Sequence, residues 1–161
     1  MATGSYNLLE VTPTINTDEY AVGDCIFIST EITGFFRGDN DAAEIKSVTI
    51  IDRGSNEPDM AIYLTTNSTT LGAINATADG ADAVTDDIQC IIPVVTADYL
   101  GGATYTDTSS VACITDPAND GIGCIVKSEN SRSIYICAIL QQAVETFAVG
   151  DLTFKIGVKY L

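Results

Sequence analysis

Residues 151–161 read DLTFKIGVKYL, and this stretch decides the fold. Large apolar side chains occupy every second position from Leu152 to Tyr160, and the positions between them carry threonine, glycine and two lysines. A period of two is the pattern of a half-buried β-strand. The stretch therefore predicts a strand with one face in the core and a basic outer face.

A second stretch, SRSIYICAILQ at residues 131–141, is apolar on both faces. In a strand, Ile134 and Ile136 would lie on one face and Tyr135 and Ile139 on the other. Such a strand is expected at the centre of a sheet or beneath a neighbouring subunit. We therefore take Tyr135 and Ile139 as candidate residues for a subunit or capsid interface.

Seven further runs have the composition of strands, and turn-forming residues separate them. They are YNLLEVTPTI, DCIFISTEI, EIKSVTIID, DMAIYLTT, DIQCIIPVV, ATYTDTSSVACI and GIGCIVKS. Many short, evenly spaced strands are typical of a β-sandwich or barrel. We predict an all-β fold: one jelly-roll-like β-sandwich domain over residues 1–161, with about eight to nine strands. Residues 1–10 are the candidate for an N-terminal arm, and Leu71–Asp87 is expected to be a long surface loop with one short helical turn.

The charge of the chain limits its partners. Seven Lys and Arg stand against 22 Asp and Glu in 161 residues, a formal net charge of −15. Phosphate backbones and anionic lipids are bound by basic side chains, so we expect no nucleic acid and no membrane as partner. The first ten residues, MATGSYNLLE, have neither the basic region nor the apolar run of a signal peptide. This predicts synthesis in a cytoplasm.

Catalytic chemistry has little support in the sequence. The chain has no histidine, which excludes Ser-His and Cys-His pairs. Its four lysines lie in amphipathic runs and are expected on the solvated face of a sheet rather than in a Ser-Lys pair. No glycine pattern fits a phosphate-binding loop, and no tryptophan is present to form a sugar platform beside the many carboxylates. We predict that the protein is not an enzyme and has no cofactor.

Metal sites are also not expected. The loops DNDAAE, DGADAVTDD and DPANDG gather oxygen ligands, but none has the spacing of a specific calcium loop. Polar turns explain their composition better. The five cysteines lack the paired spacing of a zinc site. Each lies in an apolar, strand-like context, so we expect small, buried and reduced residues. They are Cys25, Cys90, Cys113, Cys124 and Cys137.

Residues 33–44, TGFFRGDNDAAE, contain Arg37-Gly38-Asp39, a tripeptide that many adhesion receptors read. Gly38 lies between two strand runs and favours a turn, because glycine enters positive φ freely. In a strand-like backbone, at least one of the adjacent Phe35 and Phe36 must point away from the core. We therefore add Phe35 and Phe36 to the candidate interface residues.

Several short motifs occur in an order that resembles a known family. They are VTPTI at 11–15, YA at 20–21, GD at 23–24, EI at 31–32, SV at 47–48 before Asp52, LG at 71–72 before Asn75, ADY at 97–99, SRSIY at 131–135 and GDLTFKIG at 150–157. They resemble the small head decoration, or cement, proteins of tailed bacteriophages. The chain departs from that pattern in its cysteines and in an insertion around residues 104–120.

The resemblance implies a β-sandwich that binds the outside of an assembled capsid and reinforces the shell. It implies a homotrimer at local threefold positions, with the major capsid protein as partner, and it transfers no catalytic residues. Our hypothesis is therefore a non-enzymatic virion structural protein on the capsid exterior. Two alternatives stay open: a fibre or adhesin head that binds a host-surface ligand through its Asp-rich loops, and an acidic carbohydrate-active enzyme.

Overall fold

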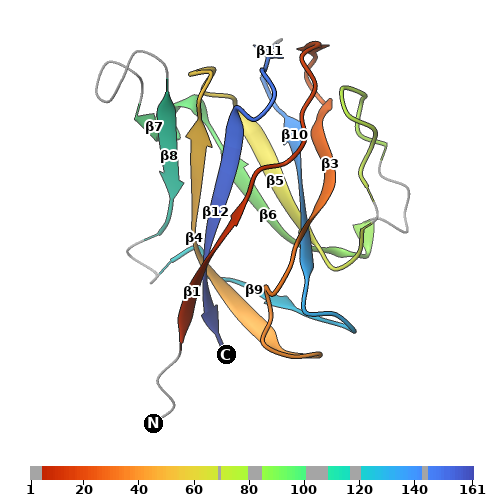
Figure 1. The fold of residues 1–161 in the computed structure, drawn as a ribbon, viewed down its shortest axis with the longest axis vertical. Coiled ribbons are helices and arrows are strands. Elements are labelled where there is room, and N and C mark those ends of the chain that lie inside the picture. Colours follow the sequence, from red (N-terminus) through yellow and green to blue (C-terminus); the bar gives the residue numbers. More distant parts are fainter. Residues whose placement is uncertain (1–4, 69, 80–84, 101–108, 117–120, 143–144) are drawn as a thin grey trace.

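We describe the protein from a computed structural model, which describes residues 5–68, 70–79, 85–100, 109–116, 121–142 and 145–161. The regular secondary structure of these ranges is almost entirely β-strand (Figure 1). The elements are β1 (Tyr6–Val11), β2 (Glu19–Tyr20), β3 (Cys25–Ile32), β4 (Ala42–Asp52), β5 (Met60–Thr65), β6 (Ile88–Val94), the 3-10 turn η1 (Thr96–Asp98), β7 (Tyr99–Leu100), β8 (Ser110–Ile114), β9 (Cys124–Lys127), β10 (Ile134–Leu140), β11 (Glu145–Thr146) and β12 (Leu152–Tyr160).

The predicted strands form. Each of the nine predicted runs overlaps one of the longer strands, β4 beginning two residues before its run, and the two-residue strands β2, β7 and β11 are additions. The all-β fold class is confirmed. Alternation located these strands because each has one side facing a common core.

Two sheets form the sandwich. One has the order β1-β12-β4-β8-β7, with β9 also pairing β4, and the other has the order β3-β10-β5-β6. We call the first the β12 sheet and the second the β10 sheet. All their pairings are antiparallel. In Figure 1 the blue β12 lies between the red β1 and the gold β4, with the β10 sheet behind.

The topology is that of a jelly roll. β1 pairs with β12, β3 with β10, β4 with β8, and β5 with β6. These four pairs are nested from the outside of the chain inward, so together they make one long hairpin. Rolling that hairpin places the first and third pairs in one sheet and the second and fourth in the other. Two four-stranded sheets related in this way are the jelly-roll arrangement.

The core lies between the sheets. Phe27 of β3 and Phe154 of β12 meet across it with ring centroids 5.3 Å apart. Four of the five inward residues of β12, from Leu152 to Val158, are buried as the alternation predicted, and the last, Tyr160, is half-buried. β10 is flanked by β3 and β5, which confirms its expected place at the centre of a sheet.

One side of the sandwich is closed by a disulfide between Cys90 of β6 and Cys124 of β9. The expectation of reduced cysteines is therefore wrong for this pair, because the roll brings two edge strands of different sheets together. The expectation that every cysteine is buried is wrong for Cys113, whose side chain is exposed. Cys25 and Cys137 are buried as expected.

The two segments expected to be irregular are partly described. Tyr6–Val11 pairs along its whole length with β12, so this part of the candidate arm belongs to the sheet; residues 1–4 lie outside the described residues. Residues 71–79 form no strand, as expected of a loop, but Leu71 is buried. The expected helical turn falls largely on residues 80–84, which also lie outside the described part.

Candidate functional site

The outer face of the β10 sheet is apolar over the middle of β10, β5 and β6, while Glu31 of the edge strand β3 and Thr65 of β5 lie opposite Tyr135. On β10, Cys137 is opposite Tyr63 of β5, and Tyr63 is opposite Ile91 of β6. In the next row Ile139 is opposite Ala61. An antiparallel sheet with one face in water normally alternates apolar and polar residues, and this sheet does not. We call the following residues the apolar face: Ala61, Tyr63, Ile91, Pro93, Tyr135, Cys137 and Ile139.

The chain itself covers one end of the apolar face. Residues 71–79 run beside the start of β3, where the amide of Cys25 donates to Ala76 O and the amide of Asn75 donates to Cys25 O, both at 2.9 Å. Gly72 lies so close to Cys25 that a Cβ there would be 2.8 Å from Sγ. The uncovered part holds Ile91, which is 53% exposed, and the half-buried Tyr63 and Tyr135.

Burial is reflected in the titration of this face. It raises the pKa of Cys137 to about 12, with a further contribution from Cys25. Burial also raises the pKa of Tyr63, and the neighbouring Cys137 and Cys25 add to the shift. These three groups therefore lie together in an environment that disfavours charge.

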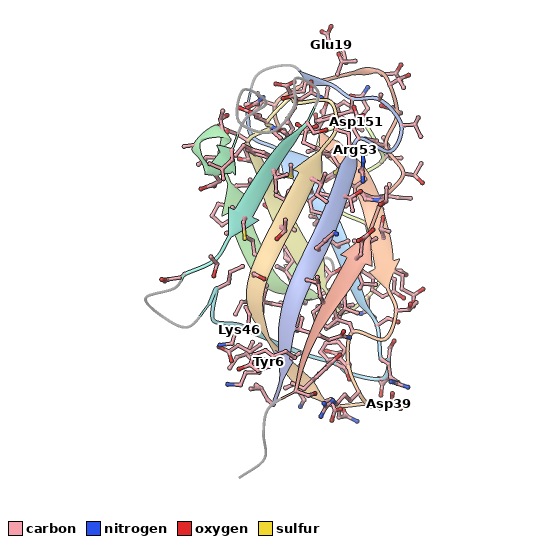
Figure 2. The ribbon with its side chains drawn as sticks, turned by 60° about the vertical axis from the view of Figure 1, so that its left-hand side comes forward. Tyr6, Glu19, Asp39, Lys46, Arg53 and Asp151 are labelled. Carbon is pink, nitrogen blue, oxygen red and sulfur yellow. A yellow bond between two sulfur atoms is a disulfide. The ribbon has the colours of Figure 1, made fainter. Side chains whose placement is uncertain are left out.

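The outer face of the β12 sheet has the opposite character. Its register places Tyr6 beside Lys159, Lys159 beside Glu44, and Glu44 beside Ile125. Figure 2 shows this face, with Lys46 and Tyr6 toward the end where β12 finishes. All four lysines of the chain lie here, as the predicted solvated face required. We call the following residues the lysine face: Tyr6, Leu8, Glu10, Glu44, Lys46, Ile125, Lys127, Lys155 and Lys159.

Ion pairs organise the lysine face. Lys46 Nζ is 2.9 Å from Glu44 Oε1, and Lys159 Nζ is 3.9 Å from Glu44 Oε2, so one carboxylate contacts two lysines. Lys155 Nζ is 3.2 Å from Glu10 Oε2. The face thus holds all four lysines of a chain whose net charge is −15.

The Arg37-Gly38-Asp39 tripeptide lies in the loop between β3 and β4. The Arg37 guanidinium carbon lies 4.5 Å from the centroid of the Tyr160 ring, a cation–π contact. Asp39 is exposed, at the end of the molecule where Figure 2 labels it. The expected positive φ at Gly38 is wrong: the left-handed residues of this loop are Gly34, at φ 67°, and Asn40, at φ 62°.

Phe35 and Phe36 are both buried in the core of their own chain. Their rings meet edge to face, with centroids 5.1 Å apart. The amide of Phe36 donates to Arg132 O at 2.9 Å, which fixes the loop to the segment before β10. The expectation that one ring points outward is wrong, because the left-handed Gly34 ends the strand and with it the alternation.

The candidate interface residues therefore have different surroundings. Tyr135 lies on the uncovered part of the apolar face, and Ile139 lies on the same face but is buried. Phe35 and Phe36 are inaccessible to another subunit in this conformation. An interface role for any of the four stays a prediction. Sequence reasoning missed the lysine face as a unit; the period of β12 placed Lys155 and Lys159 outward, but only the sheet order adds Lys46 and Lys127.

At the other end of the β12 sheet, Asp52 is a carboxylate inside the sandwich. Its oxygens accept hydrogen bonds from the amides of Gly54 at 3.0 Å and Glu57 at 2.7 Å, which hold the turn after β4. Burial raises the pKa of Asp52, and these backbone hydrogen bonds oppose the shift only in part. The neighbouring Ser110, opposite Asp52 in the register, has a buried hydroxyl with no hydrogen-bond partner among the described residues.

The described ranges hold neither a metal-binding cluster nor a membrane-spanning helix. No group of three or more Cys, Asp and Glu side chains in these ranges is arranged to hold a metal ion. No helix within them is long and apolar enough to cross a membrane.

Comparison with known proteins gives no family. No family model matches the chain, and no curated protein matches its sequence. A structure of Tomato Aspermy Virus superposes with a TM-score of 0.45 at 11% identity, covering 99% of this chain and 78% of that one. The capsid of Ralstonia phage GP4 gives 0.38 at 12% identity, covering 99% and 84%. The VP2 subviral particle of infectious bursal disease virus gives 0.33 at 11% identity, covering 99% and 41%. These values are too low to support an argument about function.

Proposed function

We propose that the protein is a non-enzymatic virion structural protein that decorates and stabilises the outer surface of a bacteriophage capsid. The observation that carries the proposal is the apolar face, of which the described segment 71–79 covers one end while Ile91 remains 53% exposed. A protein that works by contact with other subunits needs such a surface. The order of sequence motifs, which resembles that of head decoration proteins, supplies the capsid as the partner.

The jelly roll is compatible with this role but does not select it. The same arrangement serves viral capsid and lectin domains, and a fold does not fix a function. The choice between a decoration protein and an adhesin head therefore depends on the surfaces. A lectin-like role needs a polar ligand site, whereas the apolar face offers contact area to another protein.

We propose further that the uncovered part of the apolar face joins copies of the chain into a trimer. Ile91 and Tyr135 lie on different strands of this face and would be central to the contact. Aromatic and aliphatic side chains buried at the centre of an interface contribute most of its binding energy. The trimer would then sit over threefold positions of the major capsid protein lattice.

Two measurements test the proposal. Light scattering should give the mass of three 17.0 kDa chains, and the protein should co-sediment with preformed capsids that lack it. Ile91→Glu should weaken trimer formation at least about tenfold. Val22→Glu is the matched control, because Val22 is a β-branched apolar residue outside both faces with similar exposure, 58% against 53% for Ile91.

Some outcomes would contradict the proposal. A wild-type protein that stays monomeric and does not sediment with capsids would exclude the decoration role. If Asp39→Asn with Asp41→Asn abolished attachment of the virus to its host but left capsid binding unchanged, the fibre or adhesin alternative would be supported instead.

A further inference from the structure

The lysine face combines positive charge with exposed apolar side chains. Tyr6 is 66% exposed, Leu8 is 61% exposed and Ile125 is 59% exposed. They lie beside the amines: Tyr6 is opposite Lys159 in the register, and Ile125 precedes Lys127 by two positions on the same outward side of β9. Tyr6 on β1 and Ile125 on β9 stand at the two ends of the row Tyr6–Lys159–Glu44–Ile125, so exposed apolar side chains flank the charged centre of this face on both sides.

The rest of the molecule sets the sign of the partner. Outside the lysine face the chain carries twenty acidic residues and three arginines, whereas the face has four lysines and two glutamates. A surface of the opposite sign is attracted to the lysine face and repelled by the remainder of the chain, so only one orientation of docking is favourable. The charge distribution therefore orients the protein on an acidic partner.

We infer that the lysine face is the docking surface for an acidic surface of another protein. The apolar side chains Tyr6, Leu8 and Ile125 would supply contact area, and Lys127, Lys155 and Lys159 would pair with carboxylates of the partner. Lys155 and Lys159 already pair with Glu10 and Glu44, so a partner carboxylate would share these amines with the glutamates or displace them.

Nucleic acid fits this face less well than protein. Affinity for a phosphate backbone grows with the number of lysines and arginines that neutralise phosphates. Here the lysines are few, two glutamates stand among them, and the rest of the chain is strongly acidic. A contact that mixes three apolar side chains with paired charges instead has the composition of a protein interface.

The inference deepens the proposed function and rests on it only for the identity of the partner as a capsid subunit. The two faces would then have different partners: the apolar face would bind other copies of the chain, and the lysine face would bind the capsid. The chemistry of docking can be tested without the capsid.

The test uses a pair of double variants with equal charge. Lys127→Gln with Lys155→Gln removes two positive charges from the lysine face. Val22→Glu with Val149→Glu lowers the net charge by the same amount at two exposed positions in turns outside that face. The first readout is fluorescence anisotropy of a labelled poly-glutamate peptide, and the second is co-sedimentation with capsids.

The wild type and the Val22/Val149 variant should bind poly-glutamate, and the affinity should fall between about 50 mM and about 300 mM NaCl as the charges are screened. The Lys127/Lys155 variant should bind about tenfold more weakly to the peptide and to capsids. Equal binding by the two double variants would overturn the inference. So would preferential binding of the wild type to a DNA oligonucleotide, or self-association that only the lysine variant loses, since each would assign the face to a different occupant.

The outcomes separate the two proposals. If capsids bind the wild type and the lysine variant equally, the decoration role stands and the docking face is wrong. If poly-glutamate distinguishes the double variants but capsids do not bind the wild type, the docking face stands and the decoration role is wrong.

Discussion

The outer faces of the two sheets differ although the strands behind them are alike. Both faces lie on sheets that contribute to one core, and most inner residues of both are buried hydrophobics. On the β12 sheet the outward positions carry lysines paired with glutamates. On the β10 sheet they carry Tyr63, Cys137 and Ile139, and residues 71–79 cover one end.

The difference separates two kinds of surface. The inner faces satisfy the requirements of folding, because each sheet needs one apolar side for the core. The outer faces are free to differ, so their composition carries information about contacts outside the chain. Charged side chains such as those of the lysine face are well hydrated. Exposed apolar side chains are not, so covering them with a partner lowers the free energy.

The largest effect should come from placing the same charge on each face. Cys137→Asp puts a carboxylate at a buried position in the centre of the apolar face and should lower the free energy of unfolding by about 3 kcal/mol or more. Thr49→Asp puts one on the lysine face opposite Lys155 and should change it by less than about 1 kcal/mol. Urea denaturation measures both. Similar losses in the two variants would show that the faces do not differ in burial.

A smaller effect concerns the charge between the sheets. Because burial raises the pKa of Asp52, the folded state binds a proton more tightly than the unfolded chain does. Stability from this group is therefore present at and below the ordinary aspartate pKa, near about 4, and is lost as the pH rises through the raised value. Asp52→Asn lacks this dependence.

The measurement for Asp52 is thermal or urea unfolding of both proteins across acidic pH. The advantage of the wild type over Asp52→Asn should grow as the pH falls through this window. An advantage that grows with rising pH instead would mean that the backbone hydrogen bonds from Gly54 and Glu57 outweigh burial.

The smallest perturbation compares the thiols on the two faces. Cys113 is exposed on the outer side of β8, whereas Cys137 and Cys25 are buried. Burial raises the pKa of Cys137 to about 12, so almost no thiolate forms at neutral pH and its alkylation is slow. Iodoacetamide should label one site in the folded, unreduced protein and three after unfolding. Mass spectrometry identifies the sites, and Cys113→Ser should abolish the first; early labelling of Cys137 would show that the apolar face opens.

The sequence was sufficient for the strands and insufficient for their neighbours. Alternation located β12 because its side chains alternate between core and solvent, a local property. The order of strands depends on pairings between distant parts of the chain, such as Tyr6 with Lys159, which no local pattern encodes. The lysine face and the disulfide between Cys90 and Cys124 both follow from that order. The sequence therefore predicted only part of the lysine face, and it did not predict the disulfide.

The error at Phe35 and Phe36 has a different origin. Alternation applies only while the backbone stays extended, and the left-handed Gly34 ends the extended region just before these residues. A glycine next to two aromatics was visible in the sequence, but its conformation depends on the docking of this loop against Arg132. The loop between β3 and β4 does turn, as predicted, but its left-handed residues are Gly34 and Asn40 rather than Gly38.

The disulfide between β6 and β9 links the two sheets covalently along one side of the sandwich. Cys90 and Cys124 join the two sheets along one side, whereas β1 and β3, the edge strands on the other side, are held by non-covalent contacts. The two sheets would therefore separate first along the side that lacks the disulfide, at the edge strands β1 and β3. In hydrogen exchange the amides of those strands would be the first to lose protection. Because β1 carries Tyr6 and Leu8, the side on which the sheets would separate also contributes two residues to the lysine face.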